Sequence, residues 1–385
     1  MFERLEKLCV KLNGRCNYNC LYCHQPLIEK MHKDFNQFEQ LEHFLQTLDN
    51  YSKEIEIVCG GGEPTLVPSL IRKLKKITDR LEKTKNISVN LGLVTNGSRL
   101  NVLNLLIEDG ILNPKNVGIS WDGDSTTRQS DNSLIDDLLK YDFYDDVNVT
   151  YSITPMSINH MVDDFKMCWD RGIKDISYYF IHEGNYDNIK LQEKFRENID
   201  EITKEFLKRK VFDEKLTFFN FIYWHYCKKT NKPKICTKLG KGFSVGLDGK
   251  IYPCIYFGDH HKNSIGDIYN GLNKELINKF IEEYNKPYTC DWKNCSNSNC
   301  QECPASNSVH NGGCSIKTLN ICQMHNIESE VYSKYTTKVD FDEPMFKTSV
   351  PNFMLDNKKE EFSGDLDYKK GIESPALEKV RNWND

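Results

Sequence analysis

The stretch Cys16-Asn17-Tyr18-Asn19-Cys20-Leu21-Tyr22-Cys23 places three thiols on a short, turn-rich loop near the start of the chain. The spacing C-x3-C-x2-C lets three thiolates hold three irons of a [4Fe–4S] cube and leaves the fourth iron open for chemistry. A zinc site or a chance cluster of buried cysteines is the competing interpretation. Structural zinc sites use four ligands, usually in C-x2-C or Cys/His pairs, so this loop fits zinc poorly. The octet therefore predicts an iron–sulfur cluster with one open iron.

The composition excludes several classes of protein. The 385 residues are 39% hydrophobic, which predicts two domains or one barrel with an extension. Fifteen cysteines are many for a reducing compartment, where disulfides are rare, so cluster ligation explains them best. The net charge of -5 and the scattered basic residues predict no nucleic-acid partner. Neither a signal peptide nor a membrane-length apolar run is present, which predicts a cytoplasmic protein without a membrane partner.

Strand and helix patterns alternate through the first half of the chain. The expected strands are 7–12, 54–59, 88–94, 117–120, 147–153 and 175–180. The expected helices are 35–48, capped by Asp34, and 67–83, 100–107, 160–171 and 188–210. Six strand–helix units in series predict an α/β fold, a partial (β/α)6 TIM-like barrel with its functional loops at the carboxyl ends of the strands.

Three further motifs follow expected strands. Gly60-Gly61-Gly62-Glu63-Pro64 ends the second strand, Thr95-Asn96-Gly97 the third and Ser120-Trp121-Asp122-Gly123 the fourth. Consecutive glycines let the backbone approach a ligand or adopt conformations closed to other residues. Each motif alone could be an ordinary turn. Because all of them share the strand edge that carries the cysteine loop, together they predict one site.

The octet and the GGEP turn closely resemble the signature of the radical S-adenosylmethionine (SAM) superfamily. The resemblance implies that Cys16, Cys20 and Cys23 bind the catalytic cluster and that its open iron chelates the amino and carboxylate groups of SAM. It also implies that a reductant such as flavodoxin or ferredoxin supplies an electron, and that SAM then yields methionine and a 5′-deoxyadenosyl radical that abstracts hydrogen from the substrate. The residues that it places around SAM are Tyr22, Gly60, Gly61, Gly62, Glu63, Thr95, Asn96, Ser120, Asp122 and Arg128.

The alternation stops near residue 211, and cysteines accumulate beyond it. We expect a barrel at 1–211, a small Cys-rich cluster-binding domain at 212–339 and a charged tail at 340–385. Residues 243–254 predict a hairpin that turns at Asp248-Gly249. The spacing of Cys236, Gly249 and Cys254 resembles the opening of the SPASM extension, which carries two auxiliary [4Fe–4S] clusters in radical SAM enzymes that modify peptides.

The later cysteines depart from the SPASM pattern C-x2-C-x5-C-x3-C, because no cysteine stands in its third position and His310 precedes Cys314. By the resemblance, the first auxiliary cluster uses Cys227, Cys236, Cys254 and Cys314. The second uses Cys300, Cys303 and Cys322, with Cys295 as the preferred fourth ligand. Cys290 and His310 stay open as alternatives, and a zinc-ribbon-like domain is the competing structure.

The substrate is the least determined feature. The first hypothesis is a maturase that installs a thioether or carbon–carbon crosslink, or epimerises a residue, in a ribosomally made peptide. The runner-up is an anaerobic sulfatase maturase, which forms formylglycine. Those enzymes have an acidic residue after the cysteine that aligns with Cys254, whereas this chain has Ile255. From another class, a non-catalytic iron–sulfur protein for electron transfer or sensing would need neither the GGEP turn nor Ser120 and Asp122.

Overall fold

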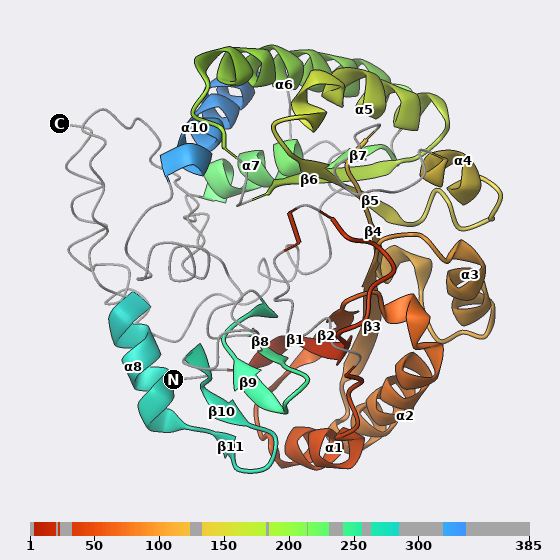
Figure 1. Ribbon diagram of the computed structural model, residues 1–385, viewed down its shortest axis with the longest axis vertical. Coiled ribbons are helices and arrows are strands. Elements are labelled where there is room, and N and C mark those ends of the chain that lie inside the picture. The colour runs from red at the N-terminus through yellow and green to blue at the C-terminus, as the bar shows by residue number, and fades with distance from the viewer. Residues whose placement is uncertain are drawn as a thin grey trace. The chain divides into compact units, whose positions relative to one another are not determined.

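The computed structural model describes residues 4–20, 22–23, 33–123, 133–181, 185–213, 215–230, 242–255, 263–284 and 319–335. The chain divides into two compact units. Residues 1–150 with 236–281 form the first unit, and residues 151–235 with 282–385 form the second. Figure 1 labels the helices and strands of both units.

The first unit is built on a mostly parallel sheet. Its strands run in the order β11-β10-β9-β8-β1-β2-β3-β4. They are β1 (Leu5–Asn13), β2 (Tyr51–Gly61), β3 (Ser88–Thr95), β4 (Val117–Trp121), β8 (Gly242–Val245), β9 (Lys250–Tyr252), β10 (Gly266–Asp267) and β11 (Gly271–Leu272). Strands β8 and β1 to β4 are parallel, while β9, β10 and β11 add antiparallel pairs at the β8 edge. The carboxyl ends of β1 to β4 therefore lie along one edge.

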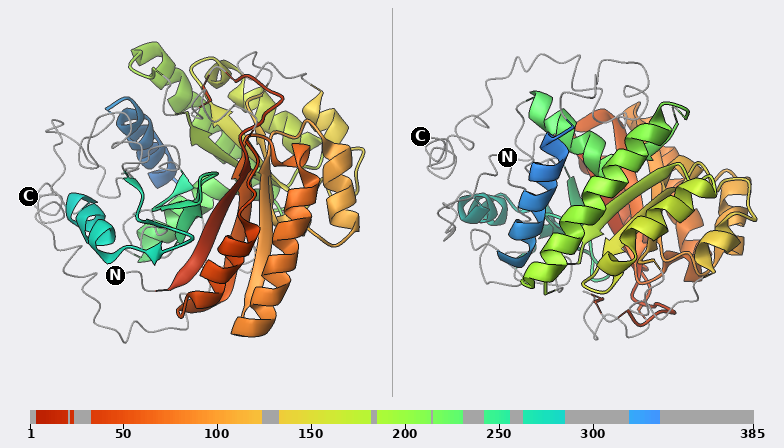
Figure 2. Two further views of the ribbon diagram at one scale, coloured as in Figure 1. Left: turned by 60° about the horizontal axis from the view of Figure 1, so that its bottom comes forward. Right: turned by 90° about the horizontal axis from the view of Figure 1, so that it is seen from above.

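Helices cover one face of this sheet (Figures 1 and 2). They are α1 (Phe38–Thr47), α2 (Pro68–Lys85) and α3 (Leu100–Glu108). The unit also contains α4 (Leu134–Leu138), the start of α8 (Lys274–Tyr284) and short 3-10 turns at Pro64–Leu66 and Pro114–Asn116. Leu8, Val10 and Leu12 alternate along β1 and are fully buried, as period-two side chains on a helix-covered face must be. The opposite face is polar near its amino end, where Lys7 forms an ion pair with Glu56. This alternation of buried apolar and more polar residues is the pattern from which the strand was predicted.

The prediction that Asp34 caps the first helix is wrong. Helix α1 begins at Phe38 with Gln37 as its cap residue, and Asp34 instead accepts two hydrogen bonds from the Arg15 guanidinium at 2.7 and 3.1 Å. Phe35 N donates to Leu12 O at 2.8 Å, which draws this segment back onto the end of β1. The Asp34 carboxylate therefore forms an ion pair with Arg15 instead of capping the helix as the local sequence predicted.

The predicted hairpin is confirmed. Strand β8 pairs antiparallel with β9, and Gly249 lies in the turn with a φ of +78°. Only glycine adopts that backbone conformation without strain, so the Asp248-Gly249 pair marked the turn correctly. On its other side β8 pairs in parallel with β1, which joins a segment far along the chain to the first strand.

The second unit combines three strands with helices. Its sheet order is β5-β6-β7, with β5 (Asn148–Ile153, entering this unit at Tyr151), β6 (Asp175–Phe180) and β7 (Thr217–Phe218). Its helices are α5 (Met161–Asp170), α6 (Ile189–Lys210), α7 (Phe219–Thr230) and α10 (Leu319–Ser333), with a 3-10 turn at Ser157–Asn159. Short β7 and helix α7 had no counterpart among the predicted elements. Figure 2 shows α10 alongside α6.

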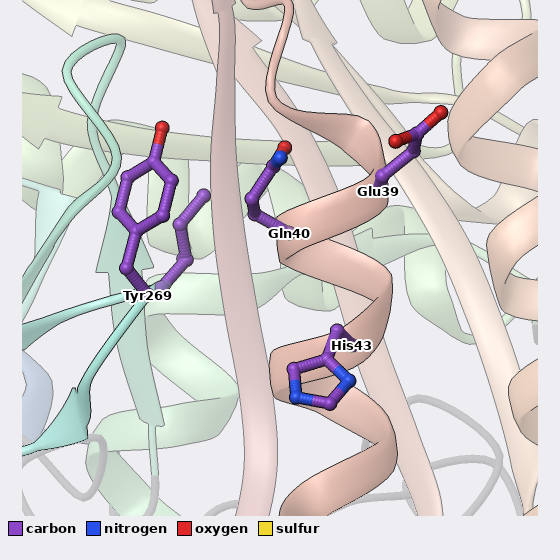
Figure 3. A pocket seen from close by; sticks show the side chains of 5 residues that line it. Glu39, Gln40, His43 and Tyr269 are labelled. Carbon is purple, nitrogen blue, oxygen red and sulfur yellow. The ribbon is translucent and has the colours of Figure 1, made fainter.

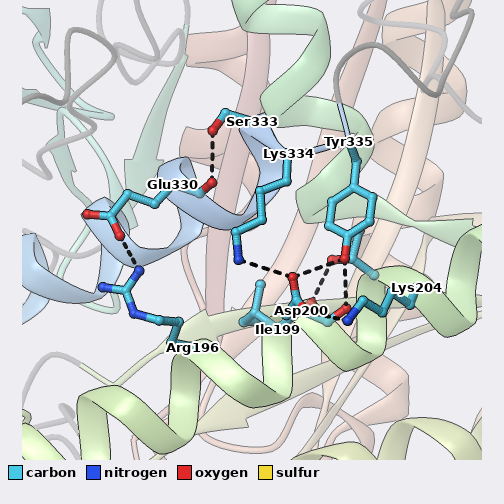
Figure 4. Close-up of polar contacts among 9 residues, drawn as sticks. Arg196, Ile199, Asp200, Lys204, Glu330, Ser333, Lys334 and Tyr335 are labelled. Atoms are coloured by element: carbon cyan, nitrogen blue, oxygen red, sulfur yellow. Dashed lines mark hydrogen bonds and ion pairs between the residues drawn. The ribbon is translucent and has the colours of Figure 1, made fainter.

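Polar contacts hold helix α10 to α6, and a buried hydroxyl network joins α10 to β6. Arg196 pairs with Glu330, while Asp200 accepts hydrogen bonds from Tyr335 at 3.0 Å and Lys334 at 3.3 Å (Figure 4). Deeper in the unit, the Tyr178 hydroxyl donates a hydrogen bond to Glu328 and lies 2.7 Å from the Tyr332 hydroxyl. His325 also forms a hydrogen bond with Glu328.

Among the described residues, no helix is both long enough and apolar enough to cross a membrane.

Candidate functional site

The cysteine loop leaves the carboxyl end of β1, as predicted. Cys16 and Cys20 are partly buried and Cys23 is exposed. Cys23 N donates to Cys20 O at 3.1 Å, which curls the second half of the loop into a turn. Gly14 N donates to Lys33 O, and the Arg15–Asp34 pair closes the loop at its base. The octet is thus anchored at the strand edge where the other motifs end.

The glycine turn at the end of β2 is bonded directly to the start of this loop. Gly62 N donates to Asn13 O at 2.8 Å, and Glu63 N donates to Arg15 O at 2.7 Å. A Cβ on Gly62 would lie 1.9 Å from Arg15 O, and one on Gly61 (φ +127°) would lie 2.3 Å from Asn13 O. Two of the three glycines are therefore required by close backbone approach within the protein itself.

Asn13 is a site residue that the sequence reasoning missed. Its side-chain NH2 donates to Glu63 O at 3.0 Å and to Arg15 O at 3.2 Å, so it fastens the cysteine loop to the glycine turn. Its Oδ1 is buried and has no hydrogen-bond partner among the described residues. An acceptor in this state fits a site that receives the donor groups of a bound cofactor. The only signal in the sequence was an Asn-Gly turn at a strand end, which is common.

Glu63 connects the glycine turn to the end of β3. It is fully buried, and its carboxyl accepts hydrogen bonds from Thr65 N at 3.0 Å, Thr65 Oγ1 at 2.5 Å, Thr95 Oγ1 at 2.7 Å and Asn96 N at 2.7 Å. Buried carboxyl oxygens need such donors, because an unsatisfied polar group is costly in a protein interior. The acidic residue of the GGEP turn therefore fixes the relative position of two predicted motifs.

Asn96 extends this network to the cysteine loop. Its NH2 donates to Asn17 Oδ1 at 3.1 Å and to Cys16 Sγ at 3.8 Å, and Tyr18 N donates to the same sulfur at 3.4 Å. Burial raises the pKa of the Cys16 thiol above its ordinary value, while the Tyr18 hydrogen bond opposes that rise. The charge of Glu63 raises the pKa further, and the Asn96 contact lowers it.

The end of β4 completes the described part of the site. Asp122 is fully buried, and its Oδ2 accepts a hydrogen bond from the Tyr22 hydroxyl at 3.3 Å. Ser120 is half-buried on the same strand. Arg128, the residue expected at the SAM carboxylate, lies outside the described residues. The structure thus brings Cys16, Tyr22, Glu63, Asn96 and Asp122 into one connected set of loops at one sheet edge.

The cysteines of the second half are described only in part. Cys254 follows β9 in the first unit, and Cys322 lies near the start of α10 in the second; both are partly buried thiols without a disulfide. Cys227 lies within α7, but its side chain is outside the described part. The remaining ligand candidates lie outside the described residues: Cys236, Cys290, Cys295, Cys300, Cys303, His310 and Cys314.

The described residues offer no site for a single metal ion. In the part of the chain that the structure describes, no three His, Cys, Asp or Glu side chains could hold a single metal ion. A [4Fe–4S] cube does not require three side chains around one ion, because each thiolate binds a different iron.

A shallow pocket of about 270 Å³ lies between α1 and the β10–β11 turn, lined by Glu39, Gln40, His43, Ile268 and Tyr269 (Figure 3). It contains no residue of the cysteine loop.

These observations define an α/β protein whose strand edge presents a three-cysteine loop, a glycine turn and polar strand ends. Residues 10–141 match the family model described as the radical SAM superfamily. The chain therefore carries a radical SAM domain, a kind of domain for which a [4Fe–4S] cluster and SAM are the cofactors.

Sequence relatives share much of this chain. An uncharacterized protein of Methanocaldococcus jannaschii is 26% identical over 267 residues, which cover 66% of this chain and 86% of that protein. A probable GTP 3′,8-cyclase of the same organism is 23% identical over 309 residues, covering 74% of this chain and 97% of the relative. Both relatives match well beyond the cysteine loop.

Solved structures share the fold. The anaerobic sulfatase maturase anSMEcpe, solved with bound AdoMet, superposes with a TM-score of 0.67 at 20% identity, covering 86% of this chain and 98% of its own. SuiB of Streptococcus suis bound to S-adenosylmethionine gives a TM-score of 0.51 at 15% identity, covering 76% of this chain and 70% of its own. This likeness confirms the predicted fold class, an α/β partial barrel of the radical SAM type.

Proposed function

We propose that this enzyme is a maturase that modifies a residue of a ribosomally made peptide, by a thioether or carbon–carbon crosslink or by epimerisation. The observation that carries the radical chemistry is the network that joins Cys16, Glu63 and Asn96 at one strand edge. The peptide substrate is supported by the cysteine spacing of the second half and by the fold shared with anSMEcpe, which has been solved with AdoMet and the Kp18Cys peptide.

In this proposal Cys16, Cys20 and Cys23 bind three irons, and the backbone of the glycine turn holds the SAM amino group. With an electron from a reductant such as flavodoxin or ferredoxin, the bound cofactors would supply the radical chemistry that removes a hydrogen atom from the peptide. The residues assigned to contacts with SAM are Tyr22, Gly60, Gly61, Gly62, Glu63, Thr95, Asn96, Ser120, Asp122 and Arg128. The proposed auxiliary ligands are Cys227, Cys236, Cys254, Cys314, Cys295, Cys300, Cys303 and Cys322.

The chain's own groups must keep water out and hold the substrate C–H near the radical, since a misplaced radical attacks protein or solvent. Hydrogen bonds from Gly62 N and Glu63 N to the backbone at the start of the cysteine loop hold the glycine turn against that loop, which supports this positioning. Asp122 can in addition hold a hydroxyl-bearing cofactor group from a fully buried position beside Tyr22.

Ile255 favours the peptide maturase over the sulfatase maturase. Its Cδ1 would lie 3.1 Å from a Cβ on Gly60, so this side chain reaches the glycine turn itself. By the resemblance, sulfatase maturases carry an acidic residue after the cysteine that aligns with Cys254, and an acidic residue can accept a proton. An isoleucine in contact with the turn supplies an apolar surface and no proton acceptor.

The test is anaerobic reconstitution of the full chain with iron and sulfide, followed by SAM and dithionite. Formation of 5′-deoxyadenosine supports the enzyme, whereas its absence would favour the non-catalytic iron–sulfur protein. The peptides encoded beside this gene are then added and followed by mass spectrometry. A crosslink removes a pair of hydrogens from the peptide, and epimerisation in deuterated water adds deuterium.

A second candidate, cyclisation of GTP, is raised by the relatives named probable GTP 3′,8-cyclase. Adding GTP to the same reaction distinguishes the two. Consumption of GTP that depends on SAM, with no change in any peptide, would replace the peptide proposal. Conversion of a cysteine in a sulfatase peptide to formylglycine would instead support the sulfatase maturase.

A further inference from the structure

The side chain of Asn96 lies between a buried carboxyl group and a proposed cluster ligand. Asn96 is 8% exposed, and its backbone N–H donates to Glu63 Oε2 at 2.7 Å. Its amide NH2 faces Cys16 Sγ at 3.8 Å and Asn17 Oδ1 at 3.1 Å. The residue is therefore held at its backbone and directed at the sulfur by its side chain.

The hydrogen-bond network determines which end of the Asn96 amide faces the thiol. Ser98 N donates to Asn96 Oδ1 at 2.9 Å, so the carbonyl end of the amide already accepts a backbone hydrogen bond. Because Asn17 Oδ1 can only accept, the NH2 end must point toward Asn17 and Cys16. A flipped amide would lose both contacts, which makes N–H donation to sulfur the stable arrangement.

We propose that Asn96 raises the reduction potential of the SAM-binding cluster by donating an N–H to the Cys16 thiolate, and that Glu63 is the positioning residue that keeps it there. The inference rests on the proposed role of Cys16 as a cluster ligand. Reduction adds one electron from the external reductant to the cluster, breaks no bond and increases the negative charge on its sulfurs. A hydrogen bond stabilises the more negative state more strongly, so it makes reduction easier.

The contact is matched to the chemistry of the site. Reductive cleavage of SAM requires a very reducing cluster, yet the electron must come from a cellular donor of limited reducing power. Among the described residues, two hydrogen bonds reach Cys16 Sγ, from Tyr18 N at 3.4 Å and from Asn96 at 3.8 Å. The backbone donor is present whatever the side chain, whereas the Asn96 donor is set by sequence. Asn96 is thus the adjustable one of these two donors.

The test compares wild type with Asn96→Ala and Asn96→Asp after anaerobic reconstitution. The midpoint potential is measured by redox titration with electron paramagnetic resonance, using the signal that changes when SAM is added so that auxiliary clusters are not counted. We expect the midpoint of Asn96→Ala to shift to a more negative potential at unchanged iron and sulfide content. Asn96→Asp should shift further, because a carboxylate would then face the thiolate.

A matched control is Asn104→Ala on α3, which removes an exposed contact between Asn104 Nδ2 and Glu108 Oε1 at 2.8 Å. It should leave the midpoint unchanged. Glu63→Gln should shift the midpoint in the same direction as Asn96→Ala, because the anchor of the Asn96 backbone is weakened. A SAM-responsive signal with the wild-type midpoint in Asn96→Ala would overturn the inference. Loss of the cluster from both Asn96 variants would also overturn it, because Asn96 would then be needed for assembly and not for potential.

This measurement is separate from the proposed function. It follows one electron entering the cluster and requires no substrate or turnover. If wild-type protein forms no 5′-deoxyadenosine, the proposed function fails, while a midpoint shift in Asn96→Ala would still establish the hydrogen bond. If wild-type protein cleaves SAM and the midpoint does not move, only the role of Asn96 fails.

Discussion

The Tyr22 hydroxyl donates a hydrogen bond to Asp122 Oδ2 at 3.3 Å, which joins the cysteine loop to the end of β4. Asp122 is fully buried at this strand end. With the contacts of Glu63 and Asn96, this bond ties the loop and its base to the ends of β2, β3 and β4. A loop held at several points can keep its ligands in place for a cluster.

Replacing Tyr22 by Phe removes this hydrogen bond and leaves the ring. We expect weaker SAM binding by several-fold, because one net hydrogen bond is worth about 1 kcal/mol. Equilibrium dialysis with reconstituted protein measures it. The control is Tyr269→Phe, which removes a hydrogen bond of 2.9 Å to Gln37 beside the pocket of Figure 3. Equal SAM affinity in Tyr22→Phe and wild type would contradict a positioning role for the hydroxyl.

Replacing Cys16, Cys20 and Cys23 together by Ala should abolish SAM cleavage and remove one cluster's worth of iron. Auxiliary iron should stay, because its proposed ligands are the cysteines of the second half. Iron and sulfide analysis and a 5′-deoxyadenosine assay measure both outcomes. Retained SAM cleavage would contradict the assignment of the octet. A wild-type iron content near four per chain would contradict the two auxiliary clusters.

Substitution of Gly62 by Ala should disrupt the site. The added Cβ would meet Arg15 O at 1.9 Å, so the hydrogen bonds that join the glycine turn to the cysteine loop must break. We expect a lowered melting temperature and poor cluster incorporation. Gly118→Ala is the matched control, because its Cβ would meet only Val94 Cγ2 at 3.9 Å, an ordinary contact. Similar cluster content in both variants would show that the hydrogen bonds between the glycine turn and the cysteine loop are not needed for cluster binding.

The raised pKa of Cys16 predicts a distinctive alkylation profile in cluster-free protein. Burial disfavours the thiolate, so less of Cys16 is reactive at neutral pH than for a solvent-exposed thiol. Its labelling rate should continue to rise above about pH 8.5, where an ordinary thiol begins to level off. Peptide mass spectrometry against free N-acetylcysteine measures the two rates. If the labelling rate of Cys16 levelled off at a lower pH than that of the reference thiol, burial would not be raising its pKa.

The fully buried hydrogen bonds of Tyr178 should stabilise the second unit more than the part-buried hydrogen bond between Tyr335 and Asp200. Tyr178→Phe removes a donor from buried Glu328, which should lower the free energy of unfolding by about 1 to 3 kcal/mol. Tyr335→Phe removes a more exposed hydrogen bond to Asp200 and should cost less (Figure 4). Denaturant titration of both variants compares them. A larger loss of stability in Tyr335→Phe than in Tyr178→Phe would show that the contact with Asp200, and not the one with Glu328, holds α10.

The sequence by itself determined the alternation of strands and helices, the Asp248-Gly249 hairpin and the cysteine loop at the end of the first strand. These are local properties: periodic burial, glycine conformation and ligand spacing are set by residues close together in the chain. Strand 175–180 was predicted with the bounds that β6 has in the structure. The cap assigned to Asp34 failed because Arg15, nineteen positions away, competes for the same carboxylate.

Tertiary structure alone decided how the motifs connect. The sequence showed that a cysteine loop, a GGEP turn and an Asn-Gly strand end share one edge, but not that Glu63 holds Asn96 or that Asn96 reaches Cys16. It also missed Asn13, whose amide joins the loop to the turn. Such contacts depend on the register of neighbouring parallel strands, which brings together residues tens of positions apart, and no local pattern encodes that register.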